Sequence, residues 1–333
     1  MVFKSAMTSD YPRIDSLSLI GQRISTLTSG NSLFRRMCNL KELNLASNKI
    51  VVVNYINELK GLQTLILSSN RITEVQSLNL PVLTMLNLDR NQIKTITGLR
   101  GLKKLEELSL EGNQIVDARM QDVGFQLVNL SELNLKDNKI RHVVKLIGYP
   151  QVKVVRLDKN PIEAIEPGSF RDCTALKTLS ICNIKLPNYT DDLKFLRACP
   201  KLEQLRMNSC FVQKDLADVS AFPDLFNMKN FSMRDVGLIR TTDLHFKMPV
   251  LEILDLQDNR VYEVEAIDDL ANFTSLVEVN FSNNPINIHA DLQNMILDAN
   301  PLLEVVNKRQ IHDIGHREQE GIKQLRREII EYE

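Results

Sequence analysis

Two histidines with metal-ligand spacing are the nearest approach to a chemical motif in this sequence. His312 and His316 stand four residues apart in "IHDIGHRE", a spacing that would place both imidazoles on one face of a helix. A zinc site needs further ligands at defined positions, and the other three histidines are scattered along the chain. We therefore predict a solvated helix here and no metal site.

The sequence also lacks the common catalytic motifs. A phosphate-binding GxxxxGK[ST] loop, a GxSxG nucleophile turn and an HExxH helix are all absent from the 333 residues. The five cysteines contain no CxxC pair, and their odd number favours reduced thiols inside a cell. These observations predict a protein that is not an enzyme and that needs no cofactor.

The stronger candidates for function are charged residues that recur at equivalent positions of a regular sequence frame. Such side chains would form ion pairs with a partner of opposite charge, which favours specific and fast association. The acidic cluster is Asp89, Glu107, Glu111 and Glu132; the basic track is Arg156, Arg206 and Arg234; Asp158 accompanies Arg156. The change of sign along the chain predicts a protein partner with a matching charge distribution.

The frame is LxxLxLxxNxI, which the chain repeats twelve times at intervals of 21 to 26 residues. "LKELNLASNKI", "LQTLILSSNRI" and "LSELNLKDNKI" are three copies, and such self-similarity is the signature of a repeat architecture. The asparagine position is occupied in turn by Gln22, Asn48, Asn70, Asn91, Asn113, Asn138, Asn160, Ile184, Cys210, Val236, Asn259 and Asn284.

One copy shows what each repeat must form. In "LSELNLKDNKI" the alternation predicts a short strand in which Leu133 and Leu135 face inward and Asn134 faces outward. Asn138 would turn the chain by hydrogen bonding to the backbone, and Ile140 would re-enter the core. Because a single repeat cannot bury its apolar face alone, neighbouring repeats must stack.

Stacking predicts an α/β solenoid, an arc of about 12 repeats with a parallel concave β-sheet and short helices or 3-10 turns on the convex side. The better helix candidates are residues 191–202 and 267–276, which each contain an early Asp. We expect one solenoid with caps over residues 1–312 and a charged amphipathic helix over residues 313–333. That helix would cover the last repeat, contact a partner or form a short coiled coil.

These repeats, from Ile14 to Ile311, resemble the leucine-rich-repeat subclass with a period near 22. The regulatory subunit of protein phosphatase 1 belongs to this subclass, so the resemblance implies the protein phosphatase 1 catalytic subunit as a candidate partner. Axonemal and spliceosomal leucine-rich-repeat proteins are also similar, and they often end in a cap like "NPLLEVVNKRQI" followed by a charged helix. The alternatives are therefore a ciliary or ribonucleoprotein assembly factor, or a GTPase regulator, although the latter have longer repeats.

Three consecutive repeats depart from the pattern, with Ile184, Cys210 and Val236 in place of asparagine. Cysteine at this place resembles the cysteine-containing repeat class. The simpler interpretation is a small buried thiol that fills the turn, and the alternative is a local change of curvature or a hinge.

The outward strand positions contain no aromatic residue in any repeat. The phosphatase subunit that this chain resembles uses aromatic as well as acidic concave residues, so only the acidic half of its pattern is present.

Composition limits the partner and the compartment. A formal charge of −1 provides no general attraction for nucleic acid, and we expect no direct contact with it. No apolar run is long enough for a membrane span or a signal peptide. We expect a monomer in the cytoplasm or nucleus, with the cilium as an alternative.

Overall fold

The structure is a computed structural model that describes residues 13–27, 33–119, 127–143, 146, 148–186, 193–212 and 219–311. The expected helix over residues 313–333 and the pair His312 and His316 lie outside this range. Contacts group the chain into two compact units. The first is Met1–Ile162 with Gly168–Leu176, and the second is Glu163–Pro167 with Lys177–Glu333.

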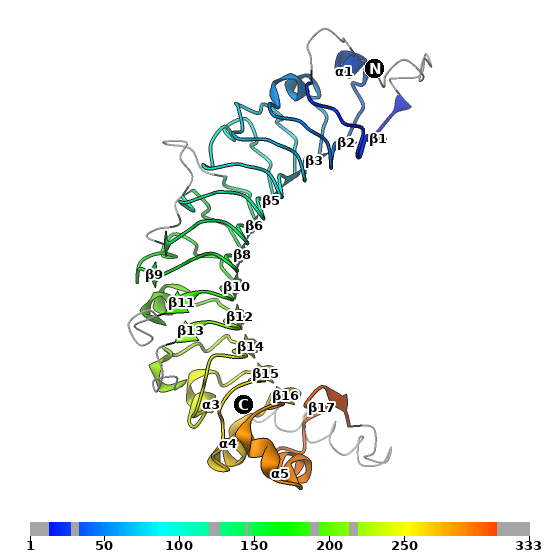
Figure 1. The fold of residues 1–333 in the computed structure, drawn as a ribbon. Helices are drawn as coiled ribbons and strands as arrows, with labels where there is room; N and C mark the ends of the chain where they lie inside the picture. The colour runs from blue at the N-terminus through cyan, green and yellow to red at the C-terminus, as the bar shows by residue number, and fades with distance from the viewer. Residues whose placement is uncertain are drawn as a thin grey trace, which may run out of the picture. The chain divides into compact units, whose positions relative to one another are not determined.

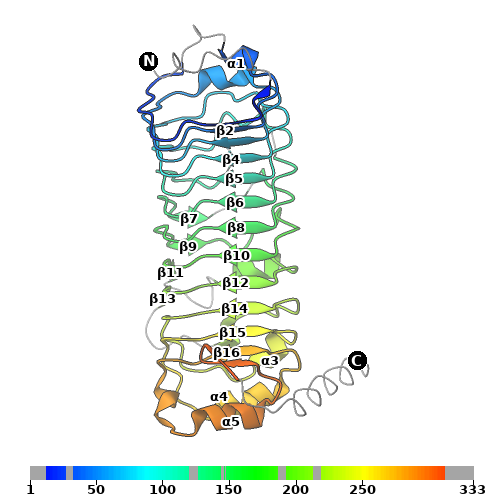
Figure 2. The same ribbon diagram turned by 90° about the vertical axis from the view of Figure 1, so that its right-hand side faces the viewer.

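The first unit contains seven parallel strands in chain order, each in register with the next (Figures 1 and 2). The strands are β1 Ser16–Ser18, β2 Glu42–Asn44, β3 Thr64–Ile66, β4 Met85–Asn87, β5 Glu107–Ser109, β6 Glu132–Asn134 and β8 Val154–Arg156. The short elements between them are α1 Leu33–Arg36, the 3-10 helix η2 Asn54–Glu58 and the two-residue strand β7 His142–Val143.

The second unit continues the same pattern. Its sheet runs in the order β10-β12-β14-β15-β16-β17-β18, and only the last pair is antiparallel. These strands are β10 Thr178–Ser180, β12 Gln204–Arg206, β14 Asn230–Ser232, β15 Ile253–Asp255, β16 Glu278–Asn280, β17 Val305–Val306 and β18 Arg309–Gln310. Two-residue strands also occur at β9 Ala164–Ile165, β11 Lys185–Leu186 and β13 Phe211–Val212.

Short helices connect the strands of the second unit, and Figure 1 shows α3 and α4 on the side away from the strands. They are η3 Leu193–Ala198, η4 Val219–Ala221, α3 Leu244–Lys247, α4 Glu265–Asp268, η5 Asp269–Asn272, η6 Pro285–Ile288 and α5 Leu292–Ala299. Both helix candidates of the sequence therefore contain helix, as 3-10 turns or as a short α-helix followed by one. The predicted fold class, a repeat solenoid with a parallel sheet and short helices, is confirmed.

The core forms as the alternation predicts. Leu133 and Leu135 are completely buried, whereas Asn134 between them is partly exposed. The central residue of each three-residue sheet strand from β2 to β16 is likewise buried, so within each unit these strands add their central residues to one apolar stack.

The asparagines form a hydrogen-bonded ladder inside each unit. Asn138 donates from Nδ2 to the carbonyl oxygens of Leu110 and Leu135 at 2.9 and 3.0 Å. Its Oδ1 accepts from the backbone N–H of Ile115 at 3.0 Å. Each asparagine therefore ties its own turn to the preceding repeat and satisfies buried backbone groups that would otherwise be unpaired.

The residue before each asparagine position adopts a left-handed backbone in all twelve repeats, with φ between 52° and 69°. Glycine supplies this conformation only at Gly21 and Gly112. The other ten positions hold Ser47, Ser69, Arg90, Asp137, Lys159, Asn183, Ser209, Asp235, Asp258 and Asn283. The tight turn therefore imposes a strained conformation on most repeats, and the asparagine ladder helps to hold it.

Two of the repeats that lack asparagine at the turn position, at Cys210 and Val236, replace its hydrogen bonds in different ways. Cys210 is buried, and its Sγ lies 3.2 Å from the carbonyl oxygen of Ile181, so the thiol occupies the turn as predicted. At Val236 no side chain can accept a hydrogen bond. There Oδ1 of Asn259, one repeat later, accepts from the backbone N–H of both Val236 and Leu238 at 3.1 Å.

Candidate partner-binding surface on the strand face

We call the surface formed by the outward residues of the sheet strands the strand face of each unit. Each strand face contains a shallow hollow. The hollow of the first unit has a volume of about 130 Å³ and is lined by residues of β4, β5, β6 and β8. The hollow of the second unit has a volume of about 310 Å³ and is lined by residues from the β12 to β16 region.

The hollow of the first unit brings together part of the acidic cluster and the first arginine of the basic track. Glu107 and Glu132 lie directly opposite each other on β5 and β6, where like charges repel. Arg156 on β8 relieves this repulsion on one side, because its guanidinium lies 3.1 Å from the Glu132 carboxylate. Glu107 is exposed, and its carboxylate makes no hydrogen bond or ion pair with the residues that the structure describes.

The rest of the acidic cluster is held by the fold. Asp89 accepts hydrogen bonds from the Ser109 hydroxyl at 2.6 Å and from the Glu111 backbone N–H at 2.8 Å. Glu111 forms an ion pair with Lys136 at 2.9 Å. Partial burial tends to raise the pKa of Glu111, but hydrogen bonds from Lys136 and Asn134 outweigh it and hold the pKa below its usual value. Both carboxylates therefore make contacts that help to hold the turns and strands of neighbouring repeats together.

Asp158 is also part of the interior rather than of the open surface. It is buried, and its negative charge adds to the main cause of the raised pKa of Lys136, the hydrogen bond that Lys136 donates to Glu111. An acidic side chain that is buried and interacts with its neighbours has little surface to offer a partner.

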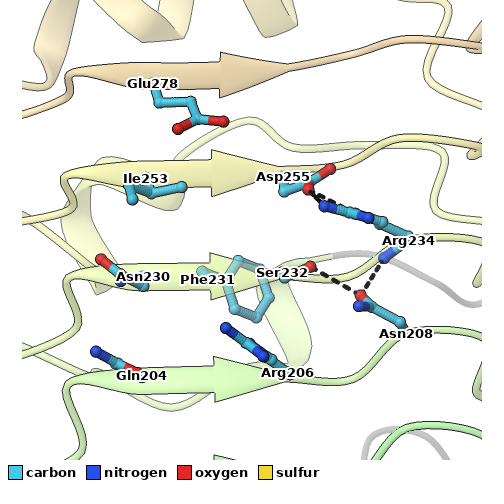
Figure 3. A pocket seen from close by; sticks show the side chains of 10 residues that line it. All are labelled: Gln204, Arg206, Asn208, Asn230, Phe231, Ser232, Arg234, Ile253, Asp255 and Glu278. Atoms are coloured by element: carbon cyan, nitrogen blue, oxygen red, sulfur yellow. Dashed lines mark hydrogen bonds and ion pairs between the residues drawn. The ribbon is translucent and has the colours of Figure 1, made fainter. Parts of the chain in front are cut away.

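The hollow of the second unit contains the other two arginines of the basic track (Figure 3). Arg234 forms an ion pair with Asp255, whose side chain is only 8% exposed, and its backbone N–H donates to Asn208 Oδ1 at 2.9 Å. Arg206 on β12 differs, because it is exposed and its guanidinium makes no hydrogen bond or ion pair within the described part of the chain. Figure 3 shows its side chain extending from β12 towards β14, away from Asp255.

The structure thus separates the eight candidate residues into two groups. Six of them interact with neighbouring side chains or lie buried, and two are exposed and unpaired among the described residues. The unpaired residues are Glu107 in the first unit and Arg206 in the second. A surface ion pair already formed within the protein must be broken before it can serve a partner, whereas an unpaired charge is available at once.

Sequence reasoning missed two features of the surface. The outward residues Met85 and Ile253 contribute apolar surface to the two hollows. Phe226, Phe246 and Tyr262 are more than half exposed and lie outside the strands, at positions that a search of the strands alone does not reach. Exposed aromatic residues of this kind are common in interfaces.

Metal and membrane sites are not evident in the described ranges. No group of three or more potential metal ligands occurs among these residues, and His245 instead lies 2.6 Å from the Asp269 carboxylate. No helix described here has the length and apolar character required to cross a bilayer.

Comparison with known families agrees with this architecture. A family model described as leucine rich repeat matches residues 60–115, and a second model of the same description matches residues 36–50. No curated protein matches the chain significantly in sequence.

Solved structures of the same fold cover most of the chain. An internalin (InlF) from Listeria monocytogenes is 19% identical, with a TM-score of 0.61, and the match covers 89% of this chain and 87% of that one. The mouse RP105/MD-1 complex matches with a TM-score of 0.67 and 19% identity over 84% of this chain and 48% of that chain. An octameric complex of Latrophilin 3, Unc5D and FLRT2 matches with a TM-score of 0.54 and 20% identity, over 86% of this chain and 78% of that chain. At these identities the likeness concerns the fold, and the two family models show leucine-rich repeats at residues 36–50 and 60–115 within it.

Proposed function

We propose that the chain is a non-enzymatic interaction scaffold that holds a partner protein on its strand face. One observation carries this proposal. Glu107 and Arg206 remain exposed and unpaired in the hollows of the strand face, while neighbouring Glu132 pairs with Arg156 and Arg234 pairs with Asp255. Repeat proteins commonly use an extended sheet surface of this kind for binding. Two of the similar structures are themselves complexes of several proteins.

The first candidate partner is the protein phosphatase 1 catalytic subunit. Its support is the resemblance of these repeats to the regulatory subunit of that enzyme. The strand face supplies outward carboxylates but no outward aromatic side chains. Binding would therefore depend on charge more than on aromatic contacts, and it would weaken steeply as salt concentration rises.

Affinity capture with the purified full chain tests the proposal. The informative variant is Glu107→Lys, and Glu74→Lys is its matched control because Glu74 is exposed and lies outside the strands. We expect Glu107→Lys to reduce capture of the main cellular partner at least several-fold and the control to leave it unchanged. Equal capture by both variants would place the interface elsewhere. Adding purified phosphatase catalytic subunit to the same two variants shows whether it is that partner.

A further inference from the structure

The hollow of the second unit has two unpaired charges of opposite sign at its ends. Arg206 lies on β12 at one end, and Glu278 lies on β16 at the other (Figure 3). Glu278 is half-buried, and its side chain, like that of Arg206, makes no hydrogen bond or ion pair with the residues described. Ile253 stands between them on β15, so the hollow is positive, then apolar, then negative.

The two end charges cannot neutralise each other. Three inter-strand steps separate β12 from β16, which corresponds to about 14 Å. The charges between them are already engaged, since Arg234 pairs with Asp255, and Asp255 also accepts a hydrogen bond from Asn280 at 3.0 Å. The hollow is therefore a polar surface whose complement must come from another molecule.

We propose that this hollow binds a segment of a partner protein that carries an acidic, an apolar and a basic side chain in that order across the strands. The acidic group would pair with Arg206, the apolar side chain would cover Ile253, and the basic group would pair with Glu278. An extended segment spans about 14 Å in four to five residues, so the two charged side chains would stand about four residues apart. This inference rests on the strand-face binding proposed above and specifies the chemistry of one part of it.

The acidic group is an oxyanion that a guanidinium can bind through two parallel hydrogen bonds. Either a carboxylate or a phosphorylated side chain satisfies that chemistry. The two sources differ in charge and size, so matched peptides can distinguish them.

Selection of a displayed random 12-residue peptide library on the full chain provides the probe. The same selection is carried out on Arg206→Glu, Glu278→Lys and the double reversal, with Arg260→Glu as a charge-matched control outside the strands. We expect the native chain and the control to enrich peptides with an acidic and a basic residue about four positions apart. Peptides selected on Arg206→Glu should no longer share the acidic residue, and those selected on Glu278→Lys should no longer share the basic residue. The double reversal should enrich peptides in which the acidic and basic residues have exchanged places.

Synthetic copies of a selected peptide then identify the oxyanion. Versions with Asp, phosphoserine or Asn at the acidic position are compared by fluorescence polarisation on the native chain. Replacing the acidic residue by Asn should weaken binding roughly tenfold or more, because a hydrogen-bonded charge pair is lost. Tighter binding of the phosphoserine version would assign the site to phosphorylated partners, and tighter binding of the Asp version to acidic ones.

An Ile253→Arg variant separates this inference from the broader proposal. If the enriched peptides share no charge pattern and Ile253→Arg abolishes their binding, the proposed charge pattern is refuted but binding at the strand face is supported. If the enriched peptides still bind Ile253→Arg, the result counts against both the charge pattern and strand-face binding in this unit. Absence of any enriched peptide would refute peptide recognition by the hollow.

Discussion

The asparagine ladder allows a quantitative test at Asn138. Replacement by Ala leaves the buried N–H of Ile115 without its acceptor, at a cost of about 1–3 kcal/mol. The three carbonyl oxygens that accept from Asn138 each keep a second donor, because Leu110 also accepts from Asn113, Leu135 from Asn160 and Lys136 from the backbone N–H of Gly112. Their weakened bonding should add about 1 kcal/mol in total. The variant should therefore be destabilised by about 2–4 kcal/mol.

Urea denaturation followed by circular dichroism measures this change, with hydrogen exchange as the local readout. Peptides that contain the Ile115 amide should exchange faster in the variant than in the native chain. Asn129→Ala is the matched control, because exposed Asn129 makes a single bond, to the Lys103 carbonyl at 2.8 Å. The control should cost less than about 1 kcal/mol. A native-like denaturation midpoint and native exchange for Asn138→Ala would refute the ladder as a source of stability.

Three further outcomes are expected. Asn259→Ala should be destabilised more than the equivalent change at a regular repeat, by about 3–5 kcal/mol in urea denaturation, because it leaves two amides unpaired rather than one. Gly101→Ala should cost about 3 kcal/mol, since its Cβ would lie 2.1 Å from a backbone carbonyl oxygen, whereas Gly168→Ala meets no atom within 4 Å and should melt like the native chain. Burial raises the pKa of the Cys173 thiol to about 12, so iodoacetamide at pH 8 should modify exposed Cys38 at least about tenfold faster by mass spectrometry. Similar rates for the two thiols, or similar melting of the two glycine variants, would contradict these assignments.

The sequence could predict the fold because one frame recurs twelve times. Each copy indicates which residues face inward and where the turn lies, and a solenoid is built only from contacts between neighbouring repeats. The left-handed backbone before each asparagine was not predicted, because Ser, Arg, Lys, Asp and Asn occupy that position with no shared chemistry except tolerance of a turn. This position could have been located from the repeat frame, because it always immediately precedes the asparagine position.

The candidate surface could be predicted only in part. Spacing places Glu107 and Glu132 on adjacent strands, but it does not show that Arg156 turns back towards Glu132 while Glu107 stays unpaired. Such pairings depend on side-chain conformations across a register that the sequence alone leaves undetermined. The same reason explains why the sequence assigned equal weight to Arg206 and to the paired Arg234.

Hydroxyl-radical footprinting of the full chain with its captured partner tests the central claim most directly. Met85 and Ile253 report on the strand faces of the two units, whereas Phe246 and Tyr262 report on the surface outside the strands. Binding at the strand face predicts that oxidation of Met85 or Ile253 falls several-fold while both aromatic residues react as in the chain alone. Protection of the aromatic residues, with Met85 and Ile253 unchanged, would contradict the account.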